Sequence, residues 1–164
     1  GFEFLAEMER LHMIVDVSHL SDKGFWDIVE HGTRPFAASH SNCRALAPHT
    51  RNLTDEMIRA LSERGGIAGL NYYAPFLDTD PTHPENCRST VELIAKHAAH
   101  YKQVGGAQMI ALGSDFDGID GPHQLENAAF LPLLADALRK EDFTEDEVEG
   151  IYYRNAMRFF EENL

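Results

Sequence analysis

Four short apolar segments, each followed by polar residues, constrain the fold of this chain more than any other feature. They span residues 13–17, 35–38, 66–70 and 109–112. All four are rich in small or branched apolar residues and are too short to form buried helices. Continuous apolar runs, as opposed to alternating ones, are typical of parallel strands that are covered on both faces. The sequence therefore predicts a sheet of four parallel strands.

Helical patterns precede, separate and follow these segments. Residues 4–10 have the pattern of a helix that leads into the first strand, and a last helix is predicted from Thr144 through Phe160. Side chains that cap helix N-termini precede the helical stretches, and Thr144 with Glu147 forms a capping box. The expected caps are Ser21, Thr54, Ser89 or Thr90, and Thr144. Strands that alternate with helices predict an α/β fold, and we expect residues 1–164 to form a single segment.

Composition excludes several classes of partner and location. The formal net charge is −13, which argues against nucleic acid or an anionic membrane as a partner because either would be repelled. No apolar stretch approaches the roughly 20 residues of a membrane span. The two cysteines form no CxxC motif, which favours a reducing compartment, and we expect the cytoplasm. The first residues lack the basic region of a signal peptide, and the abrupt helical start suggests that further residues precede them.

Polar and ionisable residues stand where each predicted strand ends. The first two strands run into His19 and His40, the third into Asn71 and the residues after it, and the fourth into Asp115 and Asp117. Both parallel barrels and doubly wound sheets gather ligands at the carboxyl ends of their strands. We therefore expect these side chains to lie together at one end of the sheet.

His19 and His40 are the candidate metal ligands. Two imidazoles at equivalent ends of neighbouring strands can approach each other as zinc ligation requires. The neighbouring serines, Ser18, Ser39 and Ser41, could orient the rings or begin a helix. The alternative is a pair of histidines that only cap helices, and the spacing alone does not decide between the two.

A carboxylate and an arginine complete the candidate site. Asp115 or Asp117, beside a dication, is suited to move a proton between water and a leaving amine, although Asp117 suits a turn cap equally well. Arg51 or Arg44, in the loop after the second strand, could bind a peptide's terminal carboxylate through two parallel hydrogen bonds. A solvated loop arginine is the alternative for either residue.

Three further histidines are candidates of lower weight. His97 and His100 are spaced i, i+3 on a predicted helix, which permits metal chelation, but we expect both on the helix surface. His123 follows the turn at Asp115, on the expected catalytic face, and could touch a substrate.

Four ordered motifs carry a resemblance to a known family. They are VDVSHLS at residues 15–21, ASHSN at 38–42, RNLTDE at 51–56 and GSDFDG at 113–118. In this order they resemble the renal (membrane) dipeptidase family of zinc peptidases. The similarity extends to residues 155–156 and so covers essentially the whole chain.

The resemblance implies an eight-stranded, TIM-type β/α barrel with two zinc ions near the strand ends. It also implies individual roles: zinc ligation for His19 and His40, proton transfer for Asp115, and substrate binding for Arg51, Asn71 and Tyr72. The activity implied is the hydrolysis of dipeptides by a metal-activated water. The family accepts a D-residue at the C-terminal side of the dipeptide.

The chain departs from the family at the first metal. There a His-x-Asp pair holds the first zinc and a glutamate bridges both ions, but no His-x-Asp occurs in this sequence. We therefore expect the C-terminal half of the barrel, about four βα units, with at most one zinc that is only partly liganded. Half a barrel exposes sheet edges and apolar surface. We expect it to need an N-terminal half, as a separate chain, as further residues or as a second copy.

The expected function is thus zinc-dependent dipeptide hydrolysis once the barrel is completed, with the isolated chain inactive. One alternative is an amidohydrolase that acts on N-acyl amino acids. Another is a non-catalytic remnant or interaction module without the first metal site.

Overall fold

Three of the four predicted strand segments form one parallel sheet. In the computed structural model, β1 (Ala37–Ala38), β2 (Ile67–Leu70) and β3 (Ile110–Leu112) lie side by side in the order β1-β2-β3. The register pairs Ala38 with Ala68 and Ala68 with Ile110. The structure describes residues 1–80, 83–121 and 123–164. The predicted α/β class with a parallel sheet is confirmed.

The first predicted strand is not a full strand. Residues 13–17 make an isolated parallel bridge between Asp16 and Ala37, with the Val17 amide 2.8 Å from the Ala37 carbonyl oxygen. Pairing stops there because β1 is only two residues long and the chain turns at Ser18 towards the next helix. Within the described residues the sheet is open, so the half barrel stays a prediction.

Helices α2, α3, α5 and α7 begin at predicted caps. The bounds of the helices are α1 (Phe2–Arg10), α2 (Asp22–His31), α3 (Asp55–Glu63), α4 (Ala74–Leu77), α5 (Val91–Gly105), α6 (Leu131–Lys140), α7 (Glu145–Glu149) and α8 (Asn155–Asn163). Short 3-10 turns lie at η1 (Pro84–Asn86), η2 (Ala107–Met109) and η3 (Ala128–Phe130). The side chains of Ser21, Thr54, Thr90 and Thr144 each accept a backbone N–H, and Thr144 with Glu147 forms the capping box. These predictions are confirmed.

Two helical features differ from the expectation. The last helix contains a π-helical turn, η4 (Gly150–Arg154), between α7 and α8. The sequence prediction missed α6, although Pro132 stands at its first turn and buried Leu134 and Leu138 have helical spacing.

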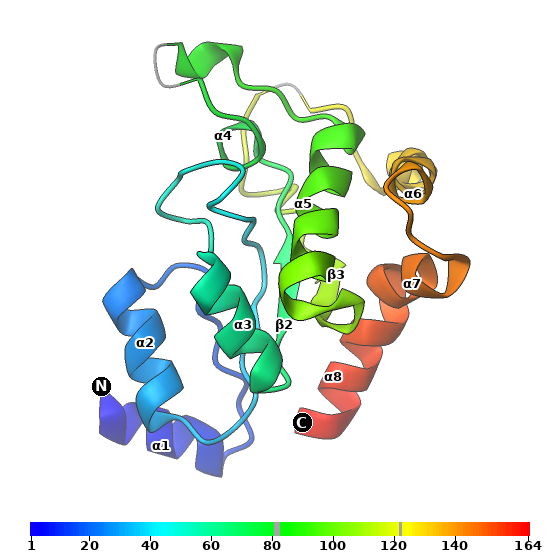
Figure 1. Ribbon diagram of the computed structural model, residues 1–164. Helices are drawn as coiled ribbons and strands as arrows, with labels where there is room; N and C mark the ends of the chain where they lie inside the picture. Colours follow the sequence, from blue (N-terminus) through cyan, green and yellow to red (C-terminus); the bar gives the residue numbers. More distant parts are fainter. Residues whose placement is uncertain (81–82, 122) are drawn as a thin grey trace.

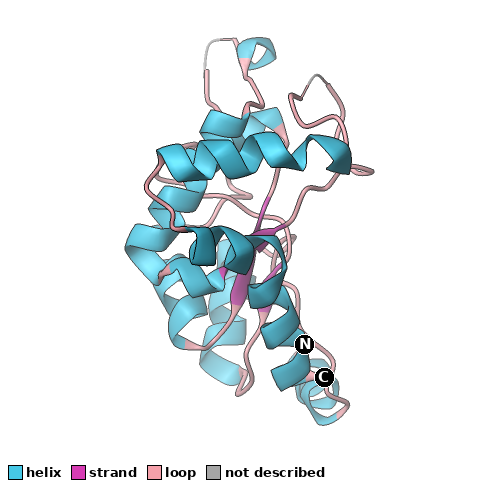
Figure 2. Cartoon of the chain, turned by 90° about the vertical axis from the view of Figure 1, so that its right-hand side faces the viewer, coloured by secondary structure: helices cyan, strands magenta, loops and turns pink. Residues whose placement is uncertain are grey.

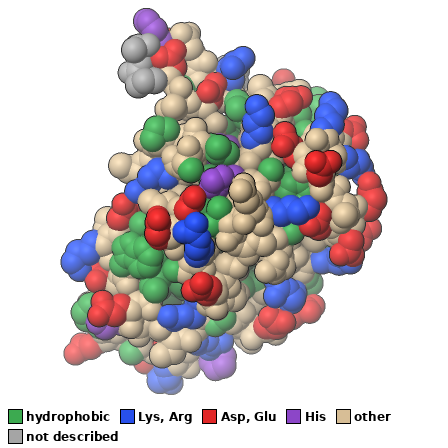
Figure 3. Space-filling view, in the orientation of Figure 1, with side chains coloured by type: hydrophobic (Ala, Val, Ile, Leu, Met, Phe, Trp, Pro, Cys, Tyr) green, Lys and Arg blue, Asp and Glu red, His purple; other side chains and the backbone are tan. Residues whose placement is uncertain are grey.

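The two faces of the sheet are covered differently. α3 and α5 lie over one face with α2 beside them, and the turned view shows the strands enclosed behind helices (Figures 1 and 2). Acidic and basic side chains mix on the outside of this face (Figure 3). On the opposite face, Ala37, Ile67 and Ala111 pack against Phe159 of α8.

The strand ends converge on one edge, where the loops of the upper half of Figure 1 lie, and both termini lie at the opposite end. Gly69 and Gly113 permit this convergence, because a Cβ atom at either position would clash with the carbonyl oxygen of Ser39. No helix within the described residues combines the length and apolarity needed to cross a membrane.

Candidate active site

The two candidate metal ligands lie in contact. The Nε2 atoms of His19 and His40 are 3.0 Å apart. Two imidazole nitrogens at zinc–nitrogen distances of about 2.0–2.1 Å in tetrahedral geometry lie about 3.3 Å apart, so the pair fits one zinc ion. The described part of the chain contains no group of three or more histidine, cysteine, aspartate or glutamate side chains that could hold a metal. The pair therefore provides two ligands of an incomplete set.

His40 is held in the neutral form that metals bind. Loss of hydration lowers the pKa of His40, and the positive charges of Arg51 and His19 lower it further. The carboxylates of Asp115 and Asp16 oppose this shift without reversing it. The lowered pKa favours the neutral ring, which has one nitrogen free to accept.

Asp16 contacts the backbone beside both histidines, a position that the sequence prediction missed. Its Oδ1 atom accepts the backbone N–H groups of Ser18 (3.1 Å) and Ser39 (3.0 Å). Partial removal from water raises the pKa of Asp16, but hydrogen bonds from Ser39 and Ser18 outweigh this and lower it below the ordinary range. A carboxylate inside an apolar strand segment was the available signal, because such a group needs partners.

Asp115 is oriented by Asn71. The Asn71 side-chain amide donates to Asp115 Oδ2 at 3.0 Å. Asp115 has left-handed backbone geometry with φ +66°, and a Cβ atom at Gly118 would clash with its carboxylate. Such conformations cost of order 1–3 kcal/mol and cluster at functional sites. Asn71, expected to bind substrate, is buried and instead holds the carboxylate.

Three buried asparagines support this part of the site. Asn42 Oδ1 accepts the backbone N–H of Asn71 (3.0 Å), and Asn52 Oδ1 accepts that of Asn42 (3.2 Å). The side-chain amides of Asn42 and Asn52 both donate to the Phe76 carbonyl oxygen, at 3.2 and 2.9 Å. Fully paired buried networks of this kind rigidify their surroundings. Asn71 and Phe76 are thereby fixed in place.

Arg51 and Arg44 have different partners. Arg51 Nε donates to the Ser18 carbonyl oxygen (2.6 Å), and the guanidinium lies 5.3 Å from the ring centroid of Phe76. Its Nη2 atom is buried and has no hydrogen-bond partner among the described residues. Arg44, in contrast, forms two 2.7 Å hydrogen bonds with Asp22. Of the two arginines, Arg51 has the unpaired guanidinium nitrogen and Arg44 is paired with a carboxylate.

A cavity of about 320 Å³ lies between His19, Arg51 and Asp115. Its lining consists of His19, Arg51, Tyr73, Phe76, Asp115, Gly118, Ile119 and Asp120. Tyr72, the predicted substrate-binding residue, does not line it: it is fully buried with its ring against Phe116. Successive side chains of an extended segment point to opposite sides, which places Tyr73 at the cavity.

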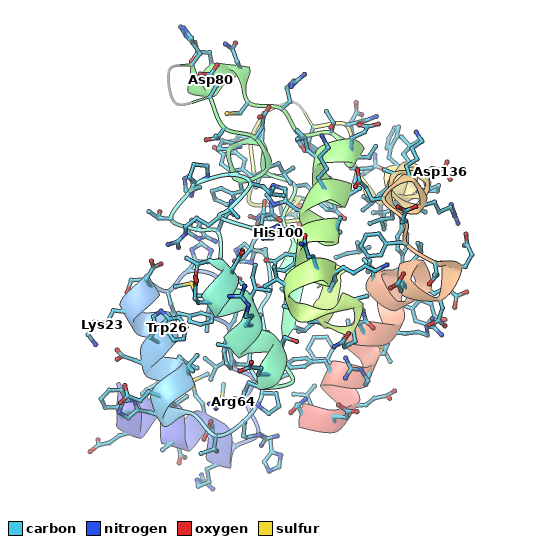
Figure 4. All side chains as sticks on the ribbon, viewed as in Figure 1. Lys23, Trp26, Arg64, Asp80, His100 and Asp136 are labelled. Carbon is cyan, nitrogen blue, oxygen red and sulfur yellow. The ribbon has the colours of Figure 1, made fainter. Side chains whose placement is uncertain are left out.

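The prediction that His97 lies on the helix surface is wrong, and His100 is half-buried. α5 packs between other helices, so its histidines face protein. His97 is buried, accepting the Cys43 backbone N–H (3.0 Å) and contacting the Leu77 carbonyl oxygen (3.1 Å). His100, labelled on α5 in Figure 4, has its Nε2 atom 2.7 Å from Asp55 Oδ1.

His123 also lies away from the candidate site. It contacts the Gly121 carbonyl oxygen and lines a separate pocket with Cys87 and Arg88.

Relatives with known sequences match nearly the whole chain. A Klebsiella pneumoniae protein described as uncharacterised, from the pqqA 5′ region, is 37% identical over 96% of this chain and 58% of its own length. Dipeptidase tcpJ of Claviceps purpurea is 32% identical over 99% of this chain and 37% of its own length. The chain thus spans about two fifths to three fifths of the relatives that it matches.

Solved structures match equally well. A Rhodobacter sphaeroides metallopeptidase, liganded with a phosphinate mimic of L-Ala-D-Ala, superimposes with a TM-score of 0.90 at 31% identity. The match covers 100% of this chain and 46% of that protein. A metallopeptidase called dipeptidase AC gives a TM-score of 0.88 at 32% identity, over 99% and 48% of the two chains. Because the family model for membrane dipeptidases (peptidase family M19) also matches residues 1–163, the chain belongs to that family.

Proposed function

We propose that this chain forms the substrate-binding part and one side of the metal site of a zinc-dependent dipeptidase. The observation that carries the proposal is the cavity that His19, Arg51 and Asp115 line together. Family membership supports peptide hydrolysis. The activity is proposed for the protein completed by an N-terminal half, and the isolated chain is expected to be inactive.

Each residue has a role in the proposed reaction. His19 and His40 would hold one zinc, and the complete site would contain two ions. Bound zinc supplies an activated water and polarises the peptide carbonyl. Arg51, which lines the cavity, would bind the substrate's terminal carboxylate through its guanidinium group. Asp115, oriented by Asn71, takes the water's proton and delivers it to the departing amine.

We further propose that a D-residue is accepted at the C-terminal side. The ligand of the Rhodobacter sphaeroides relative, a mimic of L-Ala-D-Ala, supports this choice. The test compares the hydrolysis of L-Ala-D-Ala, of its C-terminal amide and of N-acetyl-D-alanine by the completed, zinc-loaded protein. The dipeptide should be the best substrate, and its amide should be poor because Arg51 has no carboxylate to bind. Faster cleavage of N-acetyl-D-alanine would favour the N-acyl amino acid amidohydrolase instead.

Substitution of Arg51 tests its role directly. Arg51→Ala should reduce kcat/KM for L-Ala-D-Ala by about 10- to 100-fold, the value of a charge-assisted hydrogen bond, with a much smaller effect on the amide. Arg88→Ala is the matched control because its side chain is exposed and lies outside the cavity. An equal loss on the acid and the amide would contradict the role of Arg51.

Asp115→Asn tests proton transfer. Turnover should fall by about 10²- to 10⁴-fold with zinc content unchanged. Asp117→Asn is the control, since Asp117 is exposed in the same turn and lies outside the cavity lining. Full turnover by the zinc-loaded Asp115→Asn protein would remove Asp115 from the mechanism.

Exposed apolar side chains support the need for a completing half. Phe4, Leu11 and Met13 have exposed fractions of 75%, 51% and 53% and line a cavity of about 180 Å³ with Met8. We propose an N-terminal half or a second copy as the partner that covers them. A well-folded monomer in analytical ultracentrifugation would contradict this.

Cys43 and Cys87 are free thiols, which supports the proposed cytoplasmic location.

A non-catalytic module is the second candidate, because the described residues provide only the His19–His40 pair as metal ligands. Metal analysis of the completed protein separates the two. Two zinc ions per protein support the dipeptidase, and an absence of bound zinc supports the module.

A further inference from the structure

We propose that Asp16 is a positioning residue for the histidine pair: it locks the two chain segments that carry His19 and His40 and, through Ser39, fixes the tautomer of His40. The proposal rests on the proposed function only in assigning the pair to a metal. Neither the comparisons nor the sequence motifs give Asp16 this role.

The first step is a backbone lock. Asp16 Oδ1 accepts the N–H of Ser18 at 3.1 Å and that of Ser39 at 3.0 Å. These two residues directly precede His19 and His40. The Ser18 hydroxyl oxygen also accepts the backbone N–H of His40 at 3.0 Å. One carboxylate oxygen therefore ties the residue before His19 to the residue before His40, and the Ser18 hydroxyl adds a second link between the same segments.

The second step follows from a count of protons. The Ser39 hydroxyl has one proton, and it lies 2.5 Å from Asp16 Oδ2, which as a carboxylate can only accept. Ser39 Oγ also lies 2.7 Å from His40 Nδ1. Because the hydroxyl proton points to Asp16, the ring nitrogen must be the donor in this second contact. His40 is thus protonated at Nδ1.

Protonation of His40 at Nδ1 leaves its Nε2 atom as the nitrogen that can bind a metal. A neutral imidazole has one proton, so Nε2 of His40 keeps a free lone pair, and this atom faces His19 Nε2 at 3.0 Å. Histidine ligands commonly have the second nitrogen hydrogen-bonded to an oxygen group, and loss of that group typically costs 10- to 100-fold in metal affinity. In this chain the arrangement is a relay from Asp16 through Ser39 to His40.

The test reads the tautomer and the metal affinity separately. Ring ¹⁵N chemical shifts of the labelled, metal-free completed protein, at a pH where imidazole is neutral, should show His40 protonated at Nδ1. Titration with Zn²⁺ alone, followed on the His19 and His40 signals, gives the affinity. Ser39→Ala and Asp16→Asn should both mix the His40 tautomers and weaken zinc binding by about 10- to 100-fold.

Two further variants make the outcome decisive. Ser39→Thr keeps the hydroxyl and should retain the wild-type tautomer, and it tests the relay if Asp16→Asn fails to fold. Asp55→Asn is the matched control, since it removes a carboxylate 2.7 Å from His100 Nε2 on another part of the molecule. It should leave His40 and zinc affinity unchanged.

An Nε2-protonated His40 in the wild type would overturn the proposal. So would a folded Ser39→Ala protein with an unchanged tautomer or with zinc affinity within about two-fold of the wild type. Because the tautomer is read without metal or substrate, loss of the dipeptidase proposal leaves this result standing, and the reverse also holds.

Discussion

Two buried tyrosines differ in the state of their hydroxyl groups, and this difference predicts opposite effects of the same substitution. Tyr101 and Tyr72 both have an exposed fraction of 0%. The Tyr101 hydroxyl donates to the Ser41 carbonyl oxygen at 2.8 Å. The Tyr72 hydroxyl has no hydrogen-bond partner among the described residues. Removing the first breaks a pair, whereas removing the second eliminates an unpaired buried group.

The magnitude follows from the cost of an unsatisfied buried polar group, which is about 1–3 kcal/mol. Tyr101→Phe leaves the Ser41 carbonyl without this donor and should lower the free energy of unfolding by about that amount. Tyr72→Phe should cause no loss and should raise the free energy of unfolding by about 1 kcal/mol. For a chain of this size, 1 kcal/mol shifts Tm by about 2–4 °C.

Urea unfolding monitored by the fluorescence of Trp26, the single tryptophan, measures both variants under the same conditions. Equal destabilisation by the two substitutions would refute the reasoning, because it would mean that the Tyr72 hydroxyl has a partner. The same pair tests substrate binding. Burial raises the pKa of Tyr72 far above the ordinary value and keeps its hydroxyl protonated, away from the cavity. Tyr72→Phe should therefore leave KM unchanged in the completed protein.

Three further substitutions test the packing of the chain. Gly69→Ala should lower the free energy of unfolding by about 1–3 kcal/mol because the added Cβ would clash with the Ser39 backbone. Gly24→Ala, on helix α2, is the control and should not destabilise the protein. Thermal denaturation measures both variants. Burial lowers the pKa of His97 from 6.5 to about 4, so between these pH values the unfolded chain binds a proton at this residue and the folded chain does not. Urea unfolding should therefore show that the free energy of unfolding falls by about 3 kcal/mol between pH 6.5 and 4. A His97→Gln variant should lack this part of the pH dependence. Asn155→Ala should cost about 1–3 kcal/mol in urea unfolding, because its side chain donates to the carbonyl oxygens of Ala107 and Ile110; no loss would mean that water replaces both bonds.

Local signals in the sequence predicted the elements well. The caps at Ser21, Thr54 and Thr144 were predictable because a capping side chain acts within its own helical turn. The parallel sheet followed from continuous apolar runs. Residues 13–17 failed as a strand because pairing depends on the length of the neighbouring strand, which no local pattern records.

Features that depend on distant partners were harder to predict. The spacing of His97 and His100 is the same whether α5 faces solvent or protein, and only the packing of neighbouring helices decides. Loop position alone did not separate Arg51 from Arg44, although the family resemblance pointed to Arg51, because Asp22, the partner of Arg44, lies 22 residues before it. Asn42 and Asn52 carried no signal, since a buried asparagine and a loop asparagine look alike in sequence.

The Arg51–Asp115 part and the His19–His40 part of the candidate site differ in how many of the residues that hold them in place belong to this chain. Asn71 holds Asp115, and Phe76, which lies against Arg51, is held by Asn42 and Asn52, so the spacing of the proposed carboxylate-binding and proton-transfer residues is set within these 164 residues. His19 is exposed, and beyond His40 it has no companion ligand in the described chain. The hydrogen bonds of Asp16 give this histidine pair a defined spacing. If the proposed function holds, a completing half would meet a cavity that is already formed and a histidine pair that is already spaced, and it would have to supply ligands without reorganising either.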